Sequence, residues 1–247
     1  MPANRRRLAA LVALILLIAG AVAAWAWHGS ASERPRLGLF TSLPIYWAES
    51  GSIGEVLNGT EEHHWVRSAL EDDYVLIPLD TLDGTEAGRL DRLVMAQPRP
   101  LSPAENVALD QWVRKGGRLL LFADPFLTEE SRFPIGDKRR PQDVVLLSPI
   151  LQRWGLDLTF DPDQPDPEQI VALGSASIPE HMSGRFRLAT PGAPARCALL
   201  AQALIADCRV GDGHVVAVAD AALLDADHSP ASAKPALSAV AALAFSD

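Results

Sequence analysis

The first hydrophobic pattern in the chain is an uncharged run close to the N-terminus. It extends from Leu8 to Trp27, about 20 residues, and follows the basic cluster Arg5–Arg7. A helix of that length crosses a bilayer core, and the positive-inside rule keeps the arginines cytoplasmic. A cleaved signal peptide is the alternative, and either way the remainder of the chain is exported. The predicted parts are a cytoplasmic segment (1–7), a transmembrane signal-anchor (8–27), a linker (28–35) and an extracytoplasmic domain (36–247).

Downstream of this segment, short apolar runs alternate with segments of helical spacing. The clearest helix starts at Ser102, with Pro103 at its first position and Glu105 completing a capping box, and ends at Gly116-Gly117. Further apolar residues at helical spacing are Val107, Leu109, Trp112 and Val113. A second helix is predicted over 61–70, capped by Thr60. Strands are predicted at 36–41, 74–78, 92–96 and 118–124.

The strand 118–124 is almost wholly apolar, which is typical of a strand buried on both faces of a parallel sheet. Together with the preceding strand and helix it forms a βαβ unit. This pattern predicts a three-layer α/β domain.

The last third of the chain has mostly strand-like patterns. An acidic, proline-rich stretch at 161–169 precedes it and is a candidate subdomain boundary. Helices are predicted at 148–154, where Ser148 is the expected cap, and at 233–245. Strands are predicted at 156–160, 170–173, 185–189, 195–200, 204–210 and 214–220. We therefore expect the C-terminal part of the domain to be richer in β structure.

The charge and cysteine content restrict the function further. The formal net charge is −9, which argues against nucleic acid as a partner. Two cysteines are present, Cys197 and Cys208, and an exported pair is a disulfide candidate. Antiparallel pairing of the strands 196–200 and 204–210 places them opposite each other. The alternative is two small buried apolar side chains.

Two aspartates follow apolar strands in the same context. Asp124 ends LLLFAD and Asp220 ends VVAVAD. Ligands of open α/β sheets bind beyond the carboxyl ends of the strands, so both acids are candidates for ligand binding. The alternative is that each aspartate caps the turn that follows it.

The segment Thr41–Trp47 follows the first strand and is expected at the same edge of the sheet. Ser42, Tyr46 and Trp47 are therefore ligand-binding candidates, although the aromatic residues could equally close the end of the core. Neither a nucleophile elbow nor a phosphate-binding loop is found in the sequence. The pair His63-His64 points in two directions on a helix, so it favours no metal site. We predict no catalytic residue, metal or cofactor.

Two segments resemble the GldG-like auxiliary components of ABC transporters. They are SPAENVALDQWVRKGGRLLLFADP and GDGHVVAVADAALLD, and Thr41–Pro44 fits the end of the first strand. The resemblance implies a flavodoxin-like, class I glutamine-amidotransferase-like α/β fold. The matching strand end reads Phe122-Ala-Asp124-Pro125, without the cysteine that amidotransferases need.

The implied function is a non-catalytic binding or scaffolding subunit that assists an ABC transport system. Its implied partners are the permease and ATPase subunits, and its location is the bacterial inner membrane with the C-terminal domain in the periplasm. Two alternatives stay open. One is an envelope hydrolase that uses Ser42, Asp124 and Asp220, and the other is a sugar- or peptidoglycan-binding receptor that uses Tyr46 and Trp47.

Overall fold

The structure is a computed structural model that describes residues 34–47, 49, 63–84, 86–189, 195–225, 227–228 and 230–246. The chain divides into two compact units, Met1–Arg34 and Pro35–Asp247. The predicted transmembrane segment and the helix start at 60–62 lie outside the described residues. Within those residues, none of the helices combines the length and apolar character that a membrane crossing requires.

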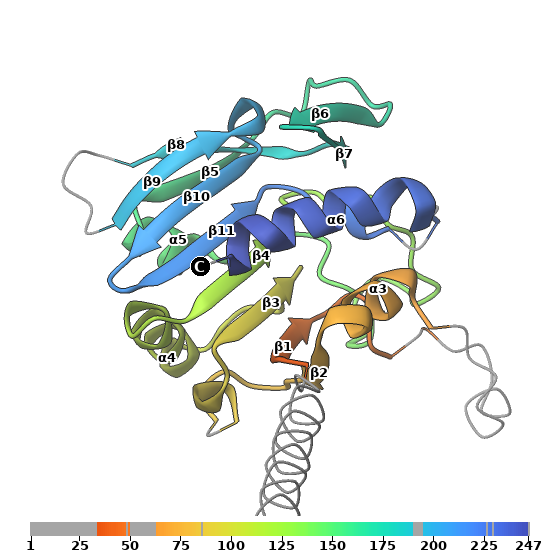
Figure 1. Cartoon of the computed structure of the whole chain (residues 1–247). Helices are drawn as coiled ribbons and strands as arrows, with labels where there is room; N and C mark the ends of the chain where they lie inside the picture. Colours follow the sequence, from red (N-terminus) through yellow and green to blue (C-terminus); the bar gives the residue numbers. More distant parts are fainter. Residues whose placement is uncertain are drawn as a thin grey trace, which may run out of the picture. The chain divides into compact units, whose positions relative to one another are not determined.

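A seven-stranded sheet forms the centre of the second unit (Figure 1). Its strands are β1 (Arg36–Thr41), β2 (Val75–Pro78), β3 (Arg92–Ala96), β4 (Arg118–Phe122), β9 (Ala195–Leu200), β10 (Ile205–Val210) and β11 (Gly213–Val218). They lie in the order β2-β1-β3-β4-β11-β10-β9. The first five strands in this order are parallel, and β10 and β9 continue the sheet antiparallel.

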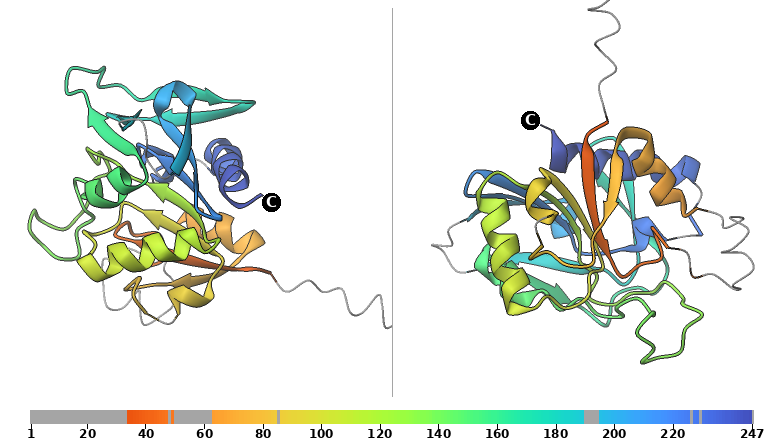
Figure 2. Two further views of the ribbon diagram at one scale, coloured as in Figure 1. Left: turned by 90° about the vertical axis from the view of Figure 1, so that its left-hand side faces the viewer. Right: turned by 90° about the horizontal axis from the view of Figure 1, so that it is seen from below.

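Helices cover both faces of the sheet (Figure 2). They are α3 (Trp65–Asp73), α4 (Pro103–Arg114), α5 (Ser148–Arg153) and α6 (Pro230–Phe245). The helices α3 and α6 lie on one face, and α4 and α5 lie on the other. Single 3-10 turns are η1 (Ala87–Arg89), η2 (Ala201–Ala203) and η3 (Ala222–Leu224). The predicted mixed α/β class with a largely parallel central sheet is confirmed.

Two small antiparallel sheets add the β-rich C-terminal part. One pairs β5 (Leu156–Phe160) with β8 (Gly184–Leu188), and the other pairs β6 (Gln169–Leu173) with β7 (Ala176–Glu180). The strand β7 was not predicted, because Pro179 lies inside it and proline is depleted in strands.

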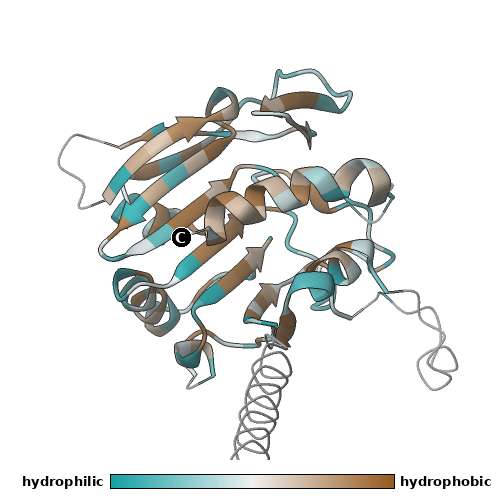
Figure 3. Ribbon diagram, viewed as in Figure 1, coloured by the Kyte–Doolittle hydropathy of each residue, from teal (hydrophilic) through white to brown (hydrophobic). Residues whose placement is uncertain are grey.

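The core lies where the most apolar strands are covered by helices. The residues Leu119–Phe122 of β4 and Val215–Val218 of β11 are all buried, and these strands are among the most hydrophobic in Figure 3. The helix α6 packs on both strands. Its buried positions include Ala233, Ala236 and Ala244, whose small side chains allow a close approach to the sheet. Helices on both faces explain why the central strands read as continuous apolar runs.

Several local predictions need correction. The helix α3 begins at Trp65, and the Nδ1 atom of His64 accepts the capping hydrogen bond from the Val66 backbone N–H at 3.2 Å. Val107 is 57% exposed, because α4 buries Leu109 and Val113 on the opposite side. A further correction is that Leu147, and not Ser148, immediately precedes α5.

The predicted disulfide is present between Cys197 of β9 and Cys208 of β10. The two residues are direct partners in the antiparallel register of these strands. The bridge therefore links the edge strand of the large sheet to its neighbour.

Candidate functional site

The candidate site lies at the carboxyl ends of β1 and β3. The chain passes from β1 outward to β2 and then returns to β3 on the other side of β1. The strand order therefore reverses between β1 and β3. Open α/β sheets bind their ligands beyond the carboxyl ends of the strands at such a point. Ser42 follows β1 and Gln97 follows β3 at this place.

Gln97 connects three segments at the edge of the sheet. Its side chain is fully buried, and its φ of 42° is unusual for a residue other than glycine. The Oε1 atom accepts from the Asp124 backbone N–H at 3.0 Å. The Nε2 atom donates to the carbonyl oxygens of Asp124 at 3.1 Å and Gln142 at 2.7 Å. Gln97 thus ties the end of β3 to the end of β4 and to the loop before α5. Gln97 was not among the predicted site residues.

Ser42 belongs to the same hydrogen-bond network. Its hydroxyl donates to the Gln97 carbonyl oxygen and accepts from the Gln142 backbone N–H at 3.0 Å. Neither partner is a base that could activate the hydroxyl. The contacts of Ser42 therefore hold two loops together.

Asp124 and Asp220 are both buried, and each carboxylate accepts two backbone hydrogen bonds. Asp124 accepts from Phe126 at 2.8 Å and from Ala221 at 3.2 Å. Asp220 accepts from Ala222 and, at 2.8 Å, from His181. These bonds cap the turns after β4 and β11 and connect the two strand ends, as the capping interpretation expects. Ligand binding by the two acids stays a prediction.

Burial changes the acidity of this pair. Burial raises the pKa of Asp124 to about 6, although its two backbone hydrogen bonds and the nearby His181 act in the opposite direction. Burial also raises the pKa of Asp220 well above its usual value, and the neighbouring Asp124 charge adds to this effect. The two carboxyl groups therefore resist being ionised together.

Three of the five predicted ligand-binding residues line one cavity. Ser42, Tyr46 and Trp47 contribute to a pocket of about 380 Å³ at this edge of the sheet. The other lining residues are Thr41, Leu43, Pro44, Glu49, Phe133 and Arg139. Asp124 and Asp220 are not among the described residues that line it. We call this cavity the strand-end pocket.

Aromatic side chains form one wall of the strand-end pocket. The rings of Tyr46 and Trp47 meet edge to face with their centroids 4.9 Å apart. The Arg67 guanidinium lies 4.3 Å from the centroid of the Tyr46 ring, and its NH1 group donates to the Tyr46 carbonyl oxygen at 3.0 Å. Tyr46 is therefore held from two sides, while Trp47 is 72% exposed.

The charged side chains of the pocket are held by neighbours in the loop after β4. The Glu49 carboxylate accepts from the Ser131 hydroxyl at 2.6 Å and from the Arg132 backbone N–H at 3.0 Å. Arg139 donates to the two carboxylate oxygens of Asp137 at 3.0 and 2.7 Å. This loop lies more than 80 positions after the first strand, so its contact with the segment around Glu49 left no local pattern in the sequence.

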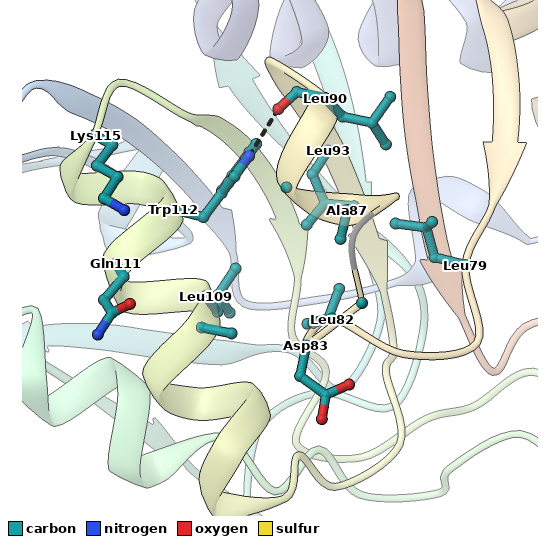
Figure 4. Close-up of a pocket in the computed structure, with 13 residues that line it drawn as sticks. Leu79, Leu82, Asp83, Ala87, Leu90, Leu93, Leu109, Gln111, Trp112 and Lys115 are labelled. Atoms are coloured by element: carbon teal, nitrogen blue, oxygen red, sulfur yellow. Dashed lines mark hydrogen bonds between the residues drawn. The ribbon is translucent and has the colours of Figure 1, made fainter.

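A second cavity of about 200 Å³ lies between α4 and the segment around η1 (Figure 4). It is lined mainly by apolar side chains, including Leu79, Leu82, Leu90, Leu93, Leu109 and Trp112. The Trp112 Nε1 group donates to the Leu90 carbonyl oxygen at 2.7 Å. The 3-10 turn η1 belongs to the connection from β2 to β3, and its residues Ala87 and Gly88 line this cavity.

Among the described residues, no cluster of three or more His, Cys, Asp or Glu side chains is arranged to hold an ion. His64 caps α3, and both cysteines form the disulfide.

A protein-family model described as "ABC-type uncharacterized transport system" matches residues 34–164, which is 131 of the 247 residues. No curated protein matches the chain.

Solved structures with a similar arrangement include two glycosidases and a bacterial cytoplasmic protein. The exo-β-1,4-mannosidase of Opitutaceae bacterium strain TAV5 is 15% identical over 90% of this chain and 36% of its own, with a TM-score of 0.46. The β-galactosidase of Rahnella sp. R3 is 12% identical over 85% of this chain and 31% of its own, with a TM-score of 0.49. A cytoplasmic protein of Salmonella typhimurium is 12% identical over 84% of this chain and 98% of its own, with a TM-score of 0.42. The chain thus spans about a third of the length of the two glycosidases.

Proposed function

Because the chain belongs to the ABC-type uncharacterized transport system family, whose proteins are auxiliary components of such systems, we propose that it is a non-catalytic, membrane-anchored subunit of one. The family match over more than half of the chain is the observation that carries this proposal. In this proposal, the domain formed by residues 36–247 lies in the periplasm and contacts the assembly of permease and ATPase subunits. The motifs of this chain resemble the GldG-like type of auxiliary component.

Two features support a binding or scaffolding role over catalysis. At the end of β4, where an amidotransferase would carry its cysteine, Asp124 accepts backbone hydrogen bonds from Phe126 and Ala221. The Ser42 hydroxyl is held between Gln97 and Gln142. The partners of the Ser42 hydroxyl are therefore backbone groups and not the general base that a serine nucleophile requires.

The strand order supports the finer assignment of the fold. The five parallel strands follow the order β2-β1-β3-β4-β11, which corresponds to the flavodoxin-like order 2-1-3-4-5. The proposed membrane anchor rests on the arginine cluster and the apolar run Leu8–Trp27.

Affinity purification from native membranes tests the proposed role. The full-length protein with a C-terminal tag is cross-linked in cells, solubilised gently and analysed by mass spectrometry. We expect an ABC permease and its ATPase to co-purify. The control is a variant in which Leu8–Trp27 is replaced by the membrane helix of an unrelated single-pass protein, which separates contacts of the domain from contacts of the anchor. If neither variant enriches a transporter subunit over an unrelated tagged membrane protein, the proposal is wrong.

A further inference from the structure

We propose that the strand-end pocket binds an uncharged carbohydrate of one or two sugar rings. This inference goes beyond the auxiliary role and does not depend on it, since it concerns the ligand of one pocket. It rests on the aromatic wall, on the balance of charges around the pocket, and on the size and position of the cavity.

The aromatic wall offers a surface on which a sugar ring can stack. Sugar rings present C–H groups on their faces, and these pack against the faces of aromatic side chains. Trp47 is 72% exposed, although burial of a tryptophan is strongly favourable. Its edge-to-face contact with Tyr46 and the two contacts of Tyr46 with Arg67 limit the rearrangement needed for binding. Phe133 adds a third ring to the lining.

The charges around the pocket favour a ligand without net charge. Arg139 is paired with Asp137 through two hydrogen bonds, and the Glu49 carboxylate lies 3.9 Å from the Nε atom of the Arg132 guanidinium. Each charged side chain in the lining therefore has a neighbour of opposite sign, so an ionic ligand would gain little from either. Hydroxyl groups can still be bound, because a guanidinium has five N–H groups and a carboxylate has about four acceptor sites.

The size and position of the cavity fit this ligand class. A volume of about 380 Å³ lies at the low end of the range of roughly 300–1,000 Å³ for small-molecule sites. The pocket lies at the reversal of the strand order, where such sheets bind their ligands. The cavity beside α4 is smaller, at about 200 Å³, and most of the residues that line it are apolar.

Isothermal titration with defined disaccharides tests the proposal. The full-length protein, in a detergent without a sugar head group, is titrated with chitobiose, cellobiose and maltose. Inorganic phosphate and the zwitterion dialanine serve as charged probes. We expect at least one disaccharide to bind, with an affinity that changes little when the salt concentration rises about tenfold, because no charged pair forms.

Variants locate the binding. Trp47→Ala should weaken the disaccharide affinity by about tenfold or more, because it removes the stacking surface. Phe126→Ala is the matched control, since Phe126 is 48% exposed and does not line the pocket. It should leave the affinity unchanged, and both variants should keep the circular dichroism spectrum of the wild type.

Three results would overturn the inference. They are the absence of binding by every disaccharide, equal affinities of Trp47→Ala and wild type, and salt-dependent binding of a charged probe alone. None of these three results depends on whether transporter subunits co-purify with the protein, so the two proposals can fail separately.

Discussion

Glu105 lies in the first turn of α4 and accepts hydrogen bonds from four other residues. Arg99 donates to its two carboxylate oxygens at 2.7 and 3.0 Å. The Thr81 hydroxyl donates at 3.1 Å, and the backbone N–H groups of Leu82 and Ser102 donate at 3.3 and 2.9 Å. The hydrogen bonds from Arg99 contribute most to lowering the pKa of Glu105, to about 2, although burial opposes them.

This shift predicts a loss of stability in acid. The pKa of Glu105 is lower in the folded protein than the usual 4.5, so its contribution is complete above pH 4.5 and is lost as the pH falls towards about 2. We expect the free energy of unfolding of the wild type to fall by up to about 3 kcal/mol when this group is protonated. The glutamine of Glu105→Gln does not titrate. The free energy of unfolding of this variant, measured in urea, should therefore fall by less than that of the wild type between pH 5 and about 2.5. Equal losses in the two proteins would contradict the assignment.

At this scale, the sequence could predict contacts only within a short segment. The capping box was predictable because Ser102 and Glu105 belong to one local motif. Arg99, Thr81 and Leu82 were not predictable partners, because packing between separate segments brings them to Glu105. Gln97 had no recognisable signature, since its role depends on the ends of β3 and β4 being adjacent.

The pocket residues show the same limit. Ser42, Tyr46 and Trp47 follow the first strand directly, so their position at the edge of the sheet could be expected. Phe133 and Arg139 come from the loop after β4, more than 80 positions further along the chain. Only the folded arrangement shows that they complete the same cavity.

Among the elements, the turn between β10 and β11 packs closely on the end of α4. A β-carbon on Gly213 would lie 1.9 Å from the Val113 carbonyl oxygen. The Asp212 backbone N–H also donates to the Arg114 carbonyl oxygen at 3.1 Å. The sheet and the helix therefore approach each other at a position where only glycine fits.

This contact predicts opposite effects for two similar substitutions. Gly213→Ala should destabilise the protein by about 3 kcal/mol or more, because the clash involves rigid backbone. Gly88→Ala is the matched control, because a β-carbon there meets no atom within 4 Å. It should be neutral or stabilise by roughly 0.4–1 kcal/mol, since alanine has fewer conformations in the unfolded chain. Thermal unfolding of both variants measures the difference, and similar melting temperatures would refute the clash.

The disulfide between β9 and β10 is expected to stabilise the protein. Cys197 and Cys208 are 11 positions apart, so the bridge closes a short loop. The chain-entropy model gives such a loop a stabilisation of about 2–3 kcal/mol. We expect the double variant Cys197→Ala/Cys208→Ala to keep its circular dichroism spectrum and to unfold at a lower temperature. Reduction should lower the melting temperature of the wild type and leave that of the variant unchanged.

Most elements could be predicted because their patterns are local. The strand β3 and the helix α4 were predicted within one or two residues, since each has a continuous apolar pattern or clear caps. The strand β7 was missed because Pro179 interrupts its pattern, and the helix α3 begins later than predicted because His64 provides its cap.

For the whole molecule, the sequence indicated a parallel sheet but not the order of its strands. Parallel neighbours are joined by long crossovers, so their adjacency leaves no local pattern. The strand β11 pairs with β4 on one side and with β10 on the other, although about 90 residues separate it from β4. Two small antiparallel sheets fold within this intervening stretch.

The buried acids and the net charge together predict how stability depends on pH. The pKa of Asp124 is about 6 in the folded protein, against an ordinary value of 3.8. Its contribution to the free energy of unfolding is therefore complete below pH 3.8 and is lost as the pH rises to about 6. Above the isoelectric point of about 5.1, the growing negative charge adds repulsion. We expect the full-length protein to be more stable at pH 5 than at pH 7.5 in urea unfolding, by about 1.4 kcal/mol from Asp124, because pH 5 lies only about one unit below its pKa in the folded protein. Asp124→Asn should show a smaller difference, and an unchanged difference would exclude Asp124 as its source.

The hydrogen bonds that join neighbouring segments at the carboxyl ends of the strands share one property. The side chains of Ser42, Gln97, Asp124 and Asp220 bond there to backbone groups of neighbouring segments. Backbone atoms are the same whatever side chains the loops carry. A change of a loop side chain such as that of Tyr46 therefore leaves these hydrogen bonds in place. The framework of this edge is in this way independent of its loop composition, so the loop sequence can vary while the fold is kept.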